Sequence, residues 1–212
     1  MASRRILRER ILPHLKTRDF SALTELAGQE KGVAELLLQF LYNPHDLMHW
    51  RALEGLGHVA EAYPQQVQKV ISRLLWLLNE DSGSFGWGAA AALGEIGRHN
   101  LSVVAHIVPM FCGFLEEPFS RAPMLWGLGR LAAVHPGELD EVRPFILPCL
   151  ADDDPQVRGL TVWVLGRLRE SEARDRLKNL LGDESPVELY DQGEMRRSSV
   201  AQLAREALAA LE

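Results

Sequence analysis

A Leu-Gly pair recurs along most of this chain at a nearly constant interval. The glycines of the pair are Gly57, Gly94, Gly129 and Gly166, and the intervals between them along the chain are 37, 35 and 37. They lie in the segments "HWRALEGLGHV", "GWGAAAALGEI", "RAPMLWGLGRL" and "RGLTVWVLGRL". A fifth copy, "RRSSVAQLAREAL", has Ala204 in the glycine position, after an interval of similar length. Repetition at this period predicts a stack of similar units, each of which buries its apolar face against its neighbours.

A second helix is expected in each unit, after the helix that carries the glycine. A helix-breaking Pro or Gly announces it, as in "AYPQQ" and "VHPGE". In the first three units its terminal leucine, which is Leu78, Leu115 or Leu150, follows the repeat glycine by the same interval each time. No strand-like alternation competes with this pattern. The sequence therefore predicts an all-α solenoid of about five helical-hairpin repeats.

The repeated unit resembles the HEAT repeat, and "DDDPQVRGLTVWVLGRL" is the copy most similar to it. Asp152 and Arg158 match the Asp and Arg, six residues apart, that link successive HEAT repeats in a polar ladder. The segment "LGRLRESEARDRLKNLLGDESP" is similar to the short HEAT-like repeat of the phycobilisome-lyase type. The resemblance covers about residues 42–212 and implies a right-handed α-α superhelix.

The other copies depart from the ladder pattern, because the position six residues before the Arg position does not hold Asp. The pairs are Arg121 with Leu115, His49 with Asn43, Gly86 with Glu80, and Arg196 with Tyr190. We therefore expect an incomplete ladder.

The whole chain, residues 1–212, is expected to form one solenoid domain. Residues 1–41 are expected to form two or three helices that cap the array as a degenerate repeat. The repeats are expected at about 42–79, 80–116, 117–152, 153–182 and 195–212.

The fourth unit departs from the others in its spacing. The interval from Gly166 to Leu181 is shorter than the glycine-to-leucine interval of the first three units, and the interval from Leu181 to Arg196 is about twice as long as its counterparts. These differences predict a shortened second helix and then an extended acidic loop, "GDESPVELYDQGEM". Loops inserted in repeat arrays often lie on the binding face, and the alternative is a tolerated surface loop. The residues of this loop that could accept a basic partner are Glu188, Tyr190, Asp191 and Glu194.

Four consecutive first helices carry a tryptophan near the solvent-facing line of a helical wheel. These residues are Trp50, Trp87, Trp126 and Trp163. Arg130 and Arg167 follow the last two at i+4, where a guanidinium can cover the ring. Two interpretations are open. The rings fill the seam between adjacent repeats, or Trp126, Arg130, Trp163 and Arg167 form a partner-binding patch, since Trp and Arg dominate interface hot spots. Buried rings would favour the seam, and exposed rings would favour the patch.

The net charge of −6 is unevenly distributed along the chain. Residues 1–18 contain six basic residues against Glu9, a net charge of +5, which leaves −11 for the remainder. An acidic body disfavours nucleic acid as a partner. The first residues lack the apolar core of a secretory signal, and no apolar run approaches the ~20 residues of a membrane span. We therefore expect a cytoplasmic protein without a membrane partner.

The sequence predicts no cofactor, no metal and no catalytic site. Cys112 and Cys149 are too few for a disulfide framework. "HDLMH" places His45 and His49 one helical turn apart, a geometry capable of binding a metal, but no third ligand is evident nearby. "SGSFGWG" lacks the Lys-Ser/Thr of a phosphate loop. The chain contains neither G-x-S-x-G nor H-E-x-x-H nor Cys-x-x-Cys.

The leading hypothesis is a non-enzymatic scaffold or adaptor that binds another protein, because solenoids offer extended concave surfaces. The resemblance to phycobilisome-lyase repeats implies an alternative, a lyase or chaperone subunit that acts on a cofactor-bearing protein, although no residue matches a catalytic position of such enzymes. A third hypothesis is a HEAT-like DNA glycosylase, a family that uses exposed Trp, Arg and Asp around a damaged base. The acidic body argues against it.

Overall fold

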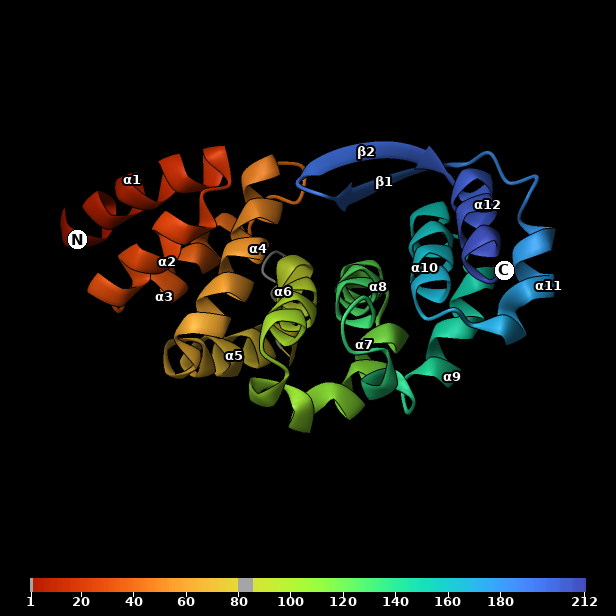
Figure 1. The fold of residues 1–212 in the computed structure, drawn as a ribbon, viewed down its shortest axis with the longest axis horizontal. Coiled ribbons are helices and arrows are strands. Elements are labelled where there is room, and N and C mark those ends of the chain that lie inside the picture. Colours follow the sequence, from red (N-terminus) through yellow and green to blue (C-terminus); the bar gives the residue numbers. More distant parts are fainter. Residues whose placement is uncertain (1, 80–85) are drawn as a thin grey trace. The chain divides into compact units, whose positions relative to one another are not determined.

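The computed structural model describes the backbone of residues 2–79 and 86–212 and the side chains of residues 4–78 and 88–212 (Figure 1). The chain divides into two compact units, Met1–Ala105 and His106–Glu212. Helices dominate both units, which confirms the all-α repeat architecture. Within the described ranges, the strands form a single hairpin, in the second unit.

The first unit is built from helices throughout its described part. Its α-helices are α1 (Ala2–Thr17), α2 (Phe20–Gln29), α3 (Val33–Leu37), α4 (Leu47–Ala62), α5 (Pro64–Asn79) and α6 (Gly86–His99). Asp19 and Asp46 precede α2 and α4, and each carboxylate accepts a hydrogen bond from a backbone N–H of the first turn. α4 packs against α6, the first helix of the next repeat, and against α5.

The second unit is arranged around one central helix. Its elements are α7 (Phe111–Glu116), α8 (Pro118–Ala132), α9 (Arg143–Ile146), α10 (Pro155–Arg167), α11 (Arg174–Asn179), β1 (Pro186–Asp191), β2 (Glu194–Ser199) and α12 (Val200–Ala210). α10 packs against α8, α12 and β1. Every residue from Gly159 to Gly166 is buried. A helix covered on several sides has no solvent-facing stripe, which is why its sequence "GLTVWVLG" is apolar all round.

The repeat glycines lie where consecutive first helices come closest. A Cβ on Gly57 would lie 2.4 Å from His99 of α6, and one on Gly129 would lie 2.1 Å from the Trp163 ring of α10. A Cβ on Gly166 would lie 2.9 Å from Ala207 of α12. The period read from the sequence is therefore the period of close helix contacts, at which a larger side chain does not fit.

The polar ladder of the second unit has two rungs. Arg121 donates hydrogen bonds to the carbonyl of Leu115 and to the carboxylate of Asp152, which lies just before α10, the first helix of the next repeat. Arg158 repeats this arrangement, with the carbonyl of Asp152 and the carboxylate of Asp183. The Arg121 rung does not need an Asp at the position six residues before the Arg, because the backbone carbonyl of Leu115 at that position accepts the hydrogen bond.

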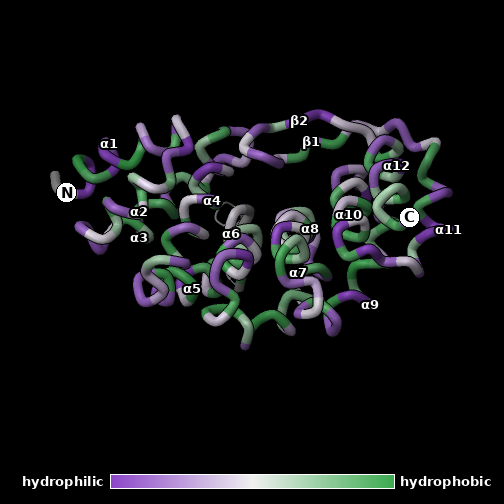
Figure 2. Tube along the Cα trace, in the orientation of Figure 1, coloured by the Kyte–Doolittle hydropathy of each residue, from purple (hydrophilic) through white to green (hydrophobic). Residues whose placement is uncertain are grey.

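The acidic loop predicted after the fourth unit is a β-hairpin, so the prediction of an extended loop was wrong. β1 pairs antiparallel with β2, and Gln192 and Gly193 form its two-residue turn. Their φ angles of 53° and 90° are those of a type I′ turn. The signal was weak because the turn is Gln-Gly rather than the usual Asn-Gly or Asp-Gly. In addition, of the two strands only β1 has buried residues, and it alternates them with exposed ones, whereas β2 is mainly hydrophilic (Figure 2).

The hairpin is an insertion whose two ends are hydrogen-bonded to each other. The N–H of Val200 donates to the carbonyl of Ser185, and the N–H of Ala201 donates to the carbonyl of Asp183. The chain thus returns to the point it left, and α12 begins at Val200, later than the expected start of the fifth repeat at residue 195. Asp183, the carboxylate partner of Arg158 in the ladder, precedes this insertion in the sequence. The position six residues before Arg196 lies inside the insertion, so the six-residue spacing did not identify Asp183.

The second helices of this unit are shorter than their sequence length suggests. Proline removes a backbone donor and distorts the helical ladder. Pro109 lies in a 3-10 turn, Ala105–Met110, that precedes α7. Pro148 lies in another, Leu147–Ala151, that follows α9. In this unit the first helices are therefore continuous and the second ones are interrupted.

Candidate functional site

The tryptophans of the third and fourth repeats are buried. Trp126 is 1% exposed, and its indole Nε1–H donates to the backbone carbonyl of Tyr190 in β1 at 2.8 Å. Trp163 is 7% exposed, and its ring lies against Gly129 of α8. Burial of both rings favours the seam interpretation. The helical wheel placed them near solvent because it takes no account of the hairpin, which covers that side of the helices.

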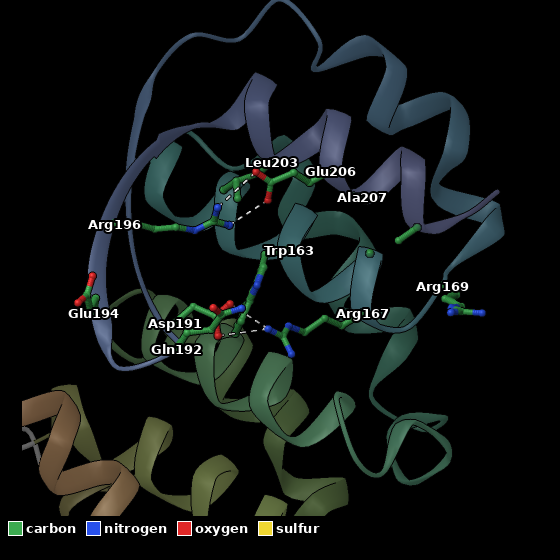
Figure 3. Close-up of a pocket in the computed structure, with 12 residues that line it drawn as sticks. Trp163, Arg167, Arg169, Asp191, Gln192, Glu194, Arg196, Leu203, Glu206 and Ala207 are labelled. Atoms are coloured by element: carbon green, nitrogen blue, oxygen red, sulfur yellow. Dashed lines mark hydrogen bonds and ion pairs between the residues drawn. The ribbon is translucent and has the colours of Figure 1, made fainter. Parts of the chain in front are cut away.

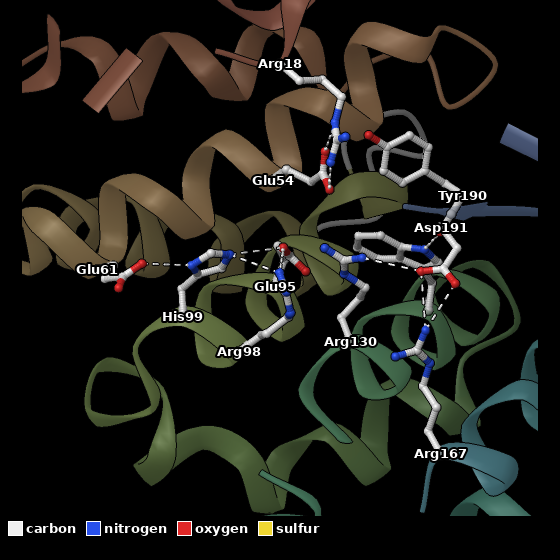
Figure 4. Close-up of polar contacts among 11 residues, drawn as sticks. Arg18, Glu54, Glu61, Glu95, Arg98, His99, Arg130, Arg167, Tyr190 and Asp191 are labelled. Atoms are coloured by element: carbon white, nitrogen blue, oxygen red, sulfur yellow. Dashed lines mark hydrogen bonds and ion pairs between the residues drawn. The ribbon is translucent and has the colours of Figure 1, made fainter. Parts of the chain in front are cut away.

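Asp191, at the end of β1, links the two arginines that follow these rings. Its carboxylate lies 3.1 Å from Nη2 of Arg167 and 3.6 Å from Nη1 of Arg130 (Figure 4). The Arg130 guanidinium lies 5.4 Å from the centre of the Trp126 ring, and that of Arg167 lies 4.4 Å from the centre of the Trp163 ring. The i+4 cation-π pairs expected from the sequence are therefore formed, with one carboxylate between them.

The four acidic or tyrosine residues predicted to bind a partner divide into two groups. Tyr190 is fully buried, with its ring 6.3 Å from that of Trp126, and Asp191 is engaged by the arginines. Glu188 and Glu194 are exposed. Glu188 forms an ion pair with Arg197 across the hairpin at 3.3 Å. Only the last two thus present their carboxylates to solvent.

The hairpin is attached to α10 by contacts that sequence reasoning missed. The side-chain amide of Gln156 exchanges two hydrogen bonds with the backbone of Glu188, at 2.7 and 2.9 Å. Val187 packs where a Cβ on Gly159 would lie, 2.5 Å from the nearest methyl carbon. The Gly in "VRGLTV" is the one local signal of this contact, because it marks a place where another chain segment approaches closely.

A cavity of about 770 Å³ opens between the end of the hairpin, α10 and α12 (Figure 3). We call it the hairpin groove. Its lining residues are Trp163, Gly166, Arg167, Arg169, Asp191, Gln192, Glu194, Arg196, Leu203, Glu206, Ala207 and Ala210. Of the predicted site residues, the groove brings together Trp163, Arg167, Asp191 and Glu194, whereas Trp126, Arg130, Glu188 and Tyr190 do not line it.

The electrostatics of the groove are dominated by internal pairs. Arg196 and Glu206 form a two-pronged ion pair, with N–O distances of 2.9 and 3.3 Å. Hydrogen bonds from Arg196 lower the pKa of the Glu206 carboxyl, and those to Glu206 raise the pKa of Arg196. Arg167 is paired with Asp191. Arg169 and Glu194 are exposed, and their side chains make no ion pair within the described ranges.

The lining offers charged groups and one amide, and two of its three carboxylates, those of Asp191 and Glu206, are held in ion pairs with arginines. The twelve lining residues include no Ser, Thr, Cys, Lys or His. Charged and small side chains of this kind can recognise a partner by ion pairs and shape.

The histidine pair of "HDLMH" does not have the geometry expected of it. His45 lies before Asp46, the residue that caps α4, so the two histidines are not one helical turn apart. His45 is exposed, whereas His49 is buried beside Gly88.

Two further tryptophans were predicted near the solvent-facing line of the first helices. Of these, Trp50 is half-buried, and its indole N–H donates to the carbonyl of Pro44 at 2.9 Å. The side chain of Trp87 lies outside the described residues.

The comparisons with known proteins agree with this architecture. The sequence model of the HEAT-like repeat matches residues 118–168, which span α8 to the end of α10. An uncharacterized protein of Archaeoglobus fulgidus is 27% identical over 172 residues, which cover 79% of this chain and 91% of that protein.

Two crystal structures of engineered proteins are similar in fold at 16% identity. One has a TM-score of 0.55 and covers 91% of this chain and 83% of the engineered one. The other has a TM-score of 0.53 and covers 90% of this chain and half of its counterpart. The chain is therefore a helical repeat protein, and its segment 118–168 is similar to the HEAT-like repeat. Among the described residues, none of the helices has the length and apolarity needed to cross a membrane.

Proposed function

We propose that this protein is a non-enzymatic scaffold that binds another protein through the hairpin groove. Helical repeat proteins of this class typically present extended binding surfaces rather than catalytic centres. The observation that carries the proposal is the exposed pair Arg169 and Glu194 at the groove. Their side chains have no ionic partner within the described ranges, in a region where the other charges are paired.

The composition of the groove favours a protein partner over a small ligand. Six of its twelve lining residues are charged, whereas small-molecule sites are lined mainly by apolar side chains. Its small residues, Gly166, Ala207 and Ala210, leave room for side chains of a partner. We propose that the partner presents both an acidic and a basic group, which would pair with Arg169 and Glu194 respectively.

The buried tryptophans change the role that the patch can have. Trp163 lines the groove with a ring that is 7% exposed, whereas Trp126 is buried against Tyr190 and does not line it. Arg167 and Asp191 reach the groove as a preformed ion pair. The glycosylase alternative expects exposed Trp beside Arg and Asp, and the burial of both rings disfavours it. The cytoplasmic location inferred from the sequence stays a prediction.

Binding can be tested with a charge reversal in the groove. The variant combines Arg169→Glu with Glu194→Lys, two exposed positions whose change leaves the core intact. The matched control combines Asp175→Lys with Lys178→Glu, which inverts an exposed ion pair on α11 outside the groove. A partner captured by the tagged full chain from native extract is purified, and its affinity for the wild type and both variants is measured.

We expect the groove variant to bind at least about 10-fold more weakly and the control to bind like the wild type. Equal affinities of the three proteins would exclude the hairpin groove as the binding surface. Repeated capture experiments without a specific partner would count against the scaffold itself.

A further inference from the structure

A cluster of two histidines and one glutamate lies in the first unit, far in sequence from the hairpin groove. His58 and Glu61 are three residues apart on α4, and His99 is the last residue of α6. One ligand atom from each residue can be chosen so that all three lie within 4.8 Å of one another. Nδ1 of His99 lies 3.1 Å from a carboxylate oxygen of Glu61 (Figure 4). The two imidazole rings are 4.4 Å apart, centre to centre.

The surrounding residues hold the two rings in place. Phe20 of α2 stacks on His58, with ring centres 4.7 Å apart and planes 18° from parallel. The His99 side chain is 10% exposed and fits against Gly57, where a Cβ would lie 2.4 Å from the ring. The repeat glycine therefore provides space for an imidazole here, as Gly129 does for an indole. Glu61, in contrast, is 65% exposed and free to adjust.

The charges around the cluster suit a cation. Glu54, Glu61 and Glu95 all act electrostatically on His58, and Glu54 is itself paired with Arg18 at 3.0 Å. Glu95 is fully buried, and its carboxylate lies 3.5 Å from Nε2 of His99. A carboxylate on the far nitrogen of a histidine is the usual arrangement behind a metal ligand, because it orients the ring and raises its basicity. Arg98 opposes this, since its Nη1 lies 3.1 Å from the same nitrogen and 2.9 Å from Glu95.

We propose that His58, Glu61 and His99 bind a divalent transition-metal ion of the Zn²⁺ class, with a water molecule as the fourth ligand. Two imidazole nitrogens and one carboxylate oxygen are ligands that zinc prefers. Tetrahedral zinc requires ligand atoms about 3.4 Å apart. The three ligand atoms lie within 4.8 Å of one another, and the exposed Glu61 side chain can adjust to an ion between them. The ion would link α4 to α6, the first helices of two successive repeats.

The two ring nitrogens of His99 have different neighbours. Nδ1 lies 3.1 Å from Glu61, and Nε2 lies 3.1 Å from Arg98 and 3.5 Å from Glu95. With the ion on Nδ1, the ring carries its proton on Nε2, which donates to Glu95. The guanidinium of Arg98 must then move away from Nε2 of His99. Its side chain is 31% exposed and can turn into solvent. Arg98 thus weakens the site, and its removal is expected to strengthen it.

The test uses the full chain stripped of metal with a chelator. Zn²⁺ is titrated against a chromophoric competitor, and Co²⁺ is used to read coordination from visible absorption. We expect one equivalent to bind, with affinity reduced at least about 10-fold by Glu61→Gln and by His99→Gln. Arg98→Gln should tighten binding several-fold. His45→Gln, an exposed histidine of the same unit, is the control and should bind like the wild type.

Three results would overturn the proposal. They are the absence of stoichiometric binding, binding that Glu61→Gln and His99→Gln leave unchanged, and a Co²⁺ spectrum typical of octahedral rather than tetrahedral coordination. Glu61→Gln keeps the test decisive if His99→Gln fails to fold, because Glu61 lies on the surface.

Discussion

At the scale of single residues, Gly129 and Trp163 show how one missing side chain determines a helix contact. The indole of α10 occupies the volume that a Cβ of α8 would fill, with three ring atoms between 2.1 and 2.9 Å away. A rigid ring that is only 7% exposed has little freedom to move. The same ring carries Arg167 above it, so the contact also supports the charged edge of the hairpin groove.

We predict that Gly129→Ala lowers the free energy of unfolding by about 1–3 kcal/mol, as overpacking does in dense cores. The matched control is Gly113→Ala in α7, where a Cβ meets no atom within 4 Å. That change should be neutral or stabilise by about 0.5 kcal/mol, because it reduces the freedom of the unfolded chain. Urea unfolding of both variants measures the difference, and equal stabilities would refute the role assigned to the ring.

His49 is a second residue whose environment makes a measurable prediction. Burial lowers its pKa from the ordinary 6.5 to about 4, against an opposing backbone hydrogen bond to Leu41. The unfolded chain therefore takes up a proton between pH 6.5 and 4 that the folded protein refuses. Stability must fall as the pH is lowered through this window, by about 3 kcal/mol for this residue, and this contribution is constant above pH 6.5.

The measurement is the free energy of unfolding of the wild type and of His49→Gln at several pH values between 4 and 7. The difference between the two proteins should shrink toward acid pH, because the variant lacks the titrating group. His45→Gln, which alters an exposed histidine, should follow the wild type throughout. Parallel curves for the wild type and His49→Gln would contradict the lowered pKa.

At the scale of elements, the hairpin covers the helices of the second unit by means of β1 alone. Val187, Leu189 and Tyr190 of β1 are buried, whereas β2 has no buried residue. β1 is thus held by helix contacts and by the Trp126 and Gln156 hydrogen bonds. β2 is held by its pairing with β1 and by the ion pair of Arg196 with Glu206 of α12. The type I′ turn sets the register of that pairing, so β2 and its Arg196 depend on it.

Gly193→Val should therefore act locally on the hairpin. A β-branched residue at φ 90° is strained, and we expect a loss of about 1–3 kcal/mol. Hydrogen exchange of β2 amides should accelerate, while that of central α10 amides should change only with the global stability. Gly182→Ala, which has ordinary backbone angles and open space around it, is the control. Uniform acceleration across the second unit would show that the hairpin and the helices unfold as one element.

At the scale of the whole molecule, the chain comprises two units with their own cores. The second unit contains the consecutive helices α8, α10 and α12, the ladder rungs of Arg121 and Arg158, and the hairpin. In repeat proteins stability is approximately the sum of the repeats and their nearest-neighbour contacts. A set of repeats with its own core can therefore fold without the rest of the array.

We predict that a fragment of residues 106–212 folds by itself. Its circular dichroism should be helical, and its thermal transition should be cooperative, although at a lower temperature than that of the full chain. The reference is the fragment with Arg158→Met, which removes one rung and should lower the midpoint further. A fragment without a cooperative transition would show that the second unit requires the first.

The sequence by itself determined the helical character, the period and the positions of the close helix contacts. These features depend on local spacing, since a glycine that returns at a regular interval on an apolar helix has the same meaning in each copy. Only the tertiary structure decided that Trp126 and Trp163 are buried and that Asp191 pairs with two arginines. The hydrogen bond from Trp126 to Tyr190 joins residues 64 positions apart, through a hairpin that interrupts the repeat. Likewise, His99 meets Glu61 across 38 positions. A repeat pattern describes what its units share, whereas the groove and the histidine cluster arise from residues that the units do not share.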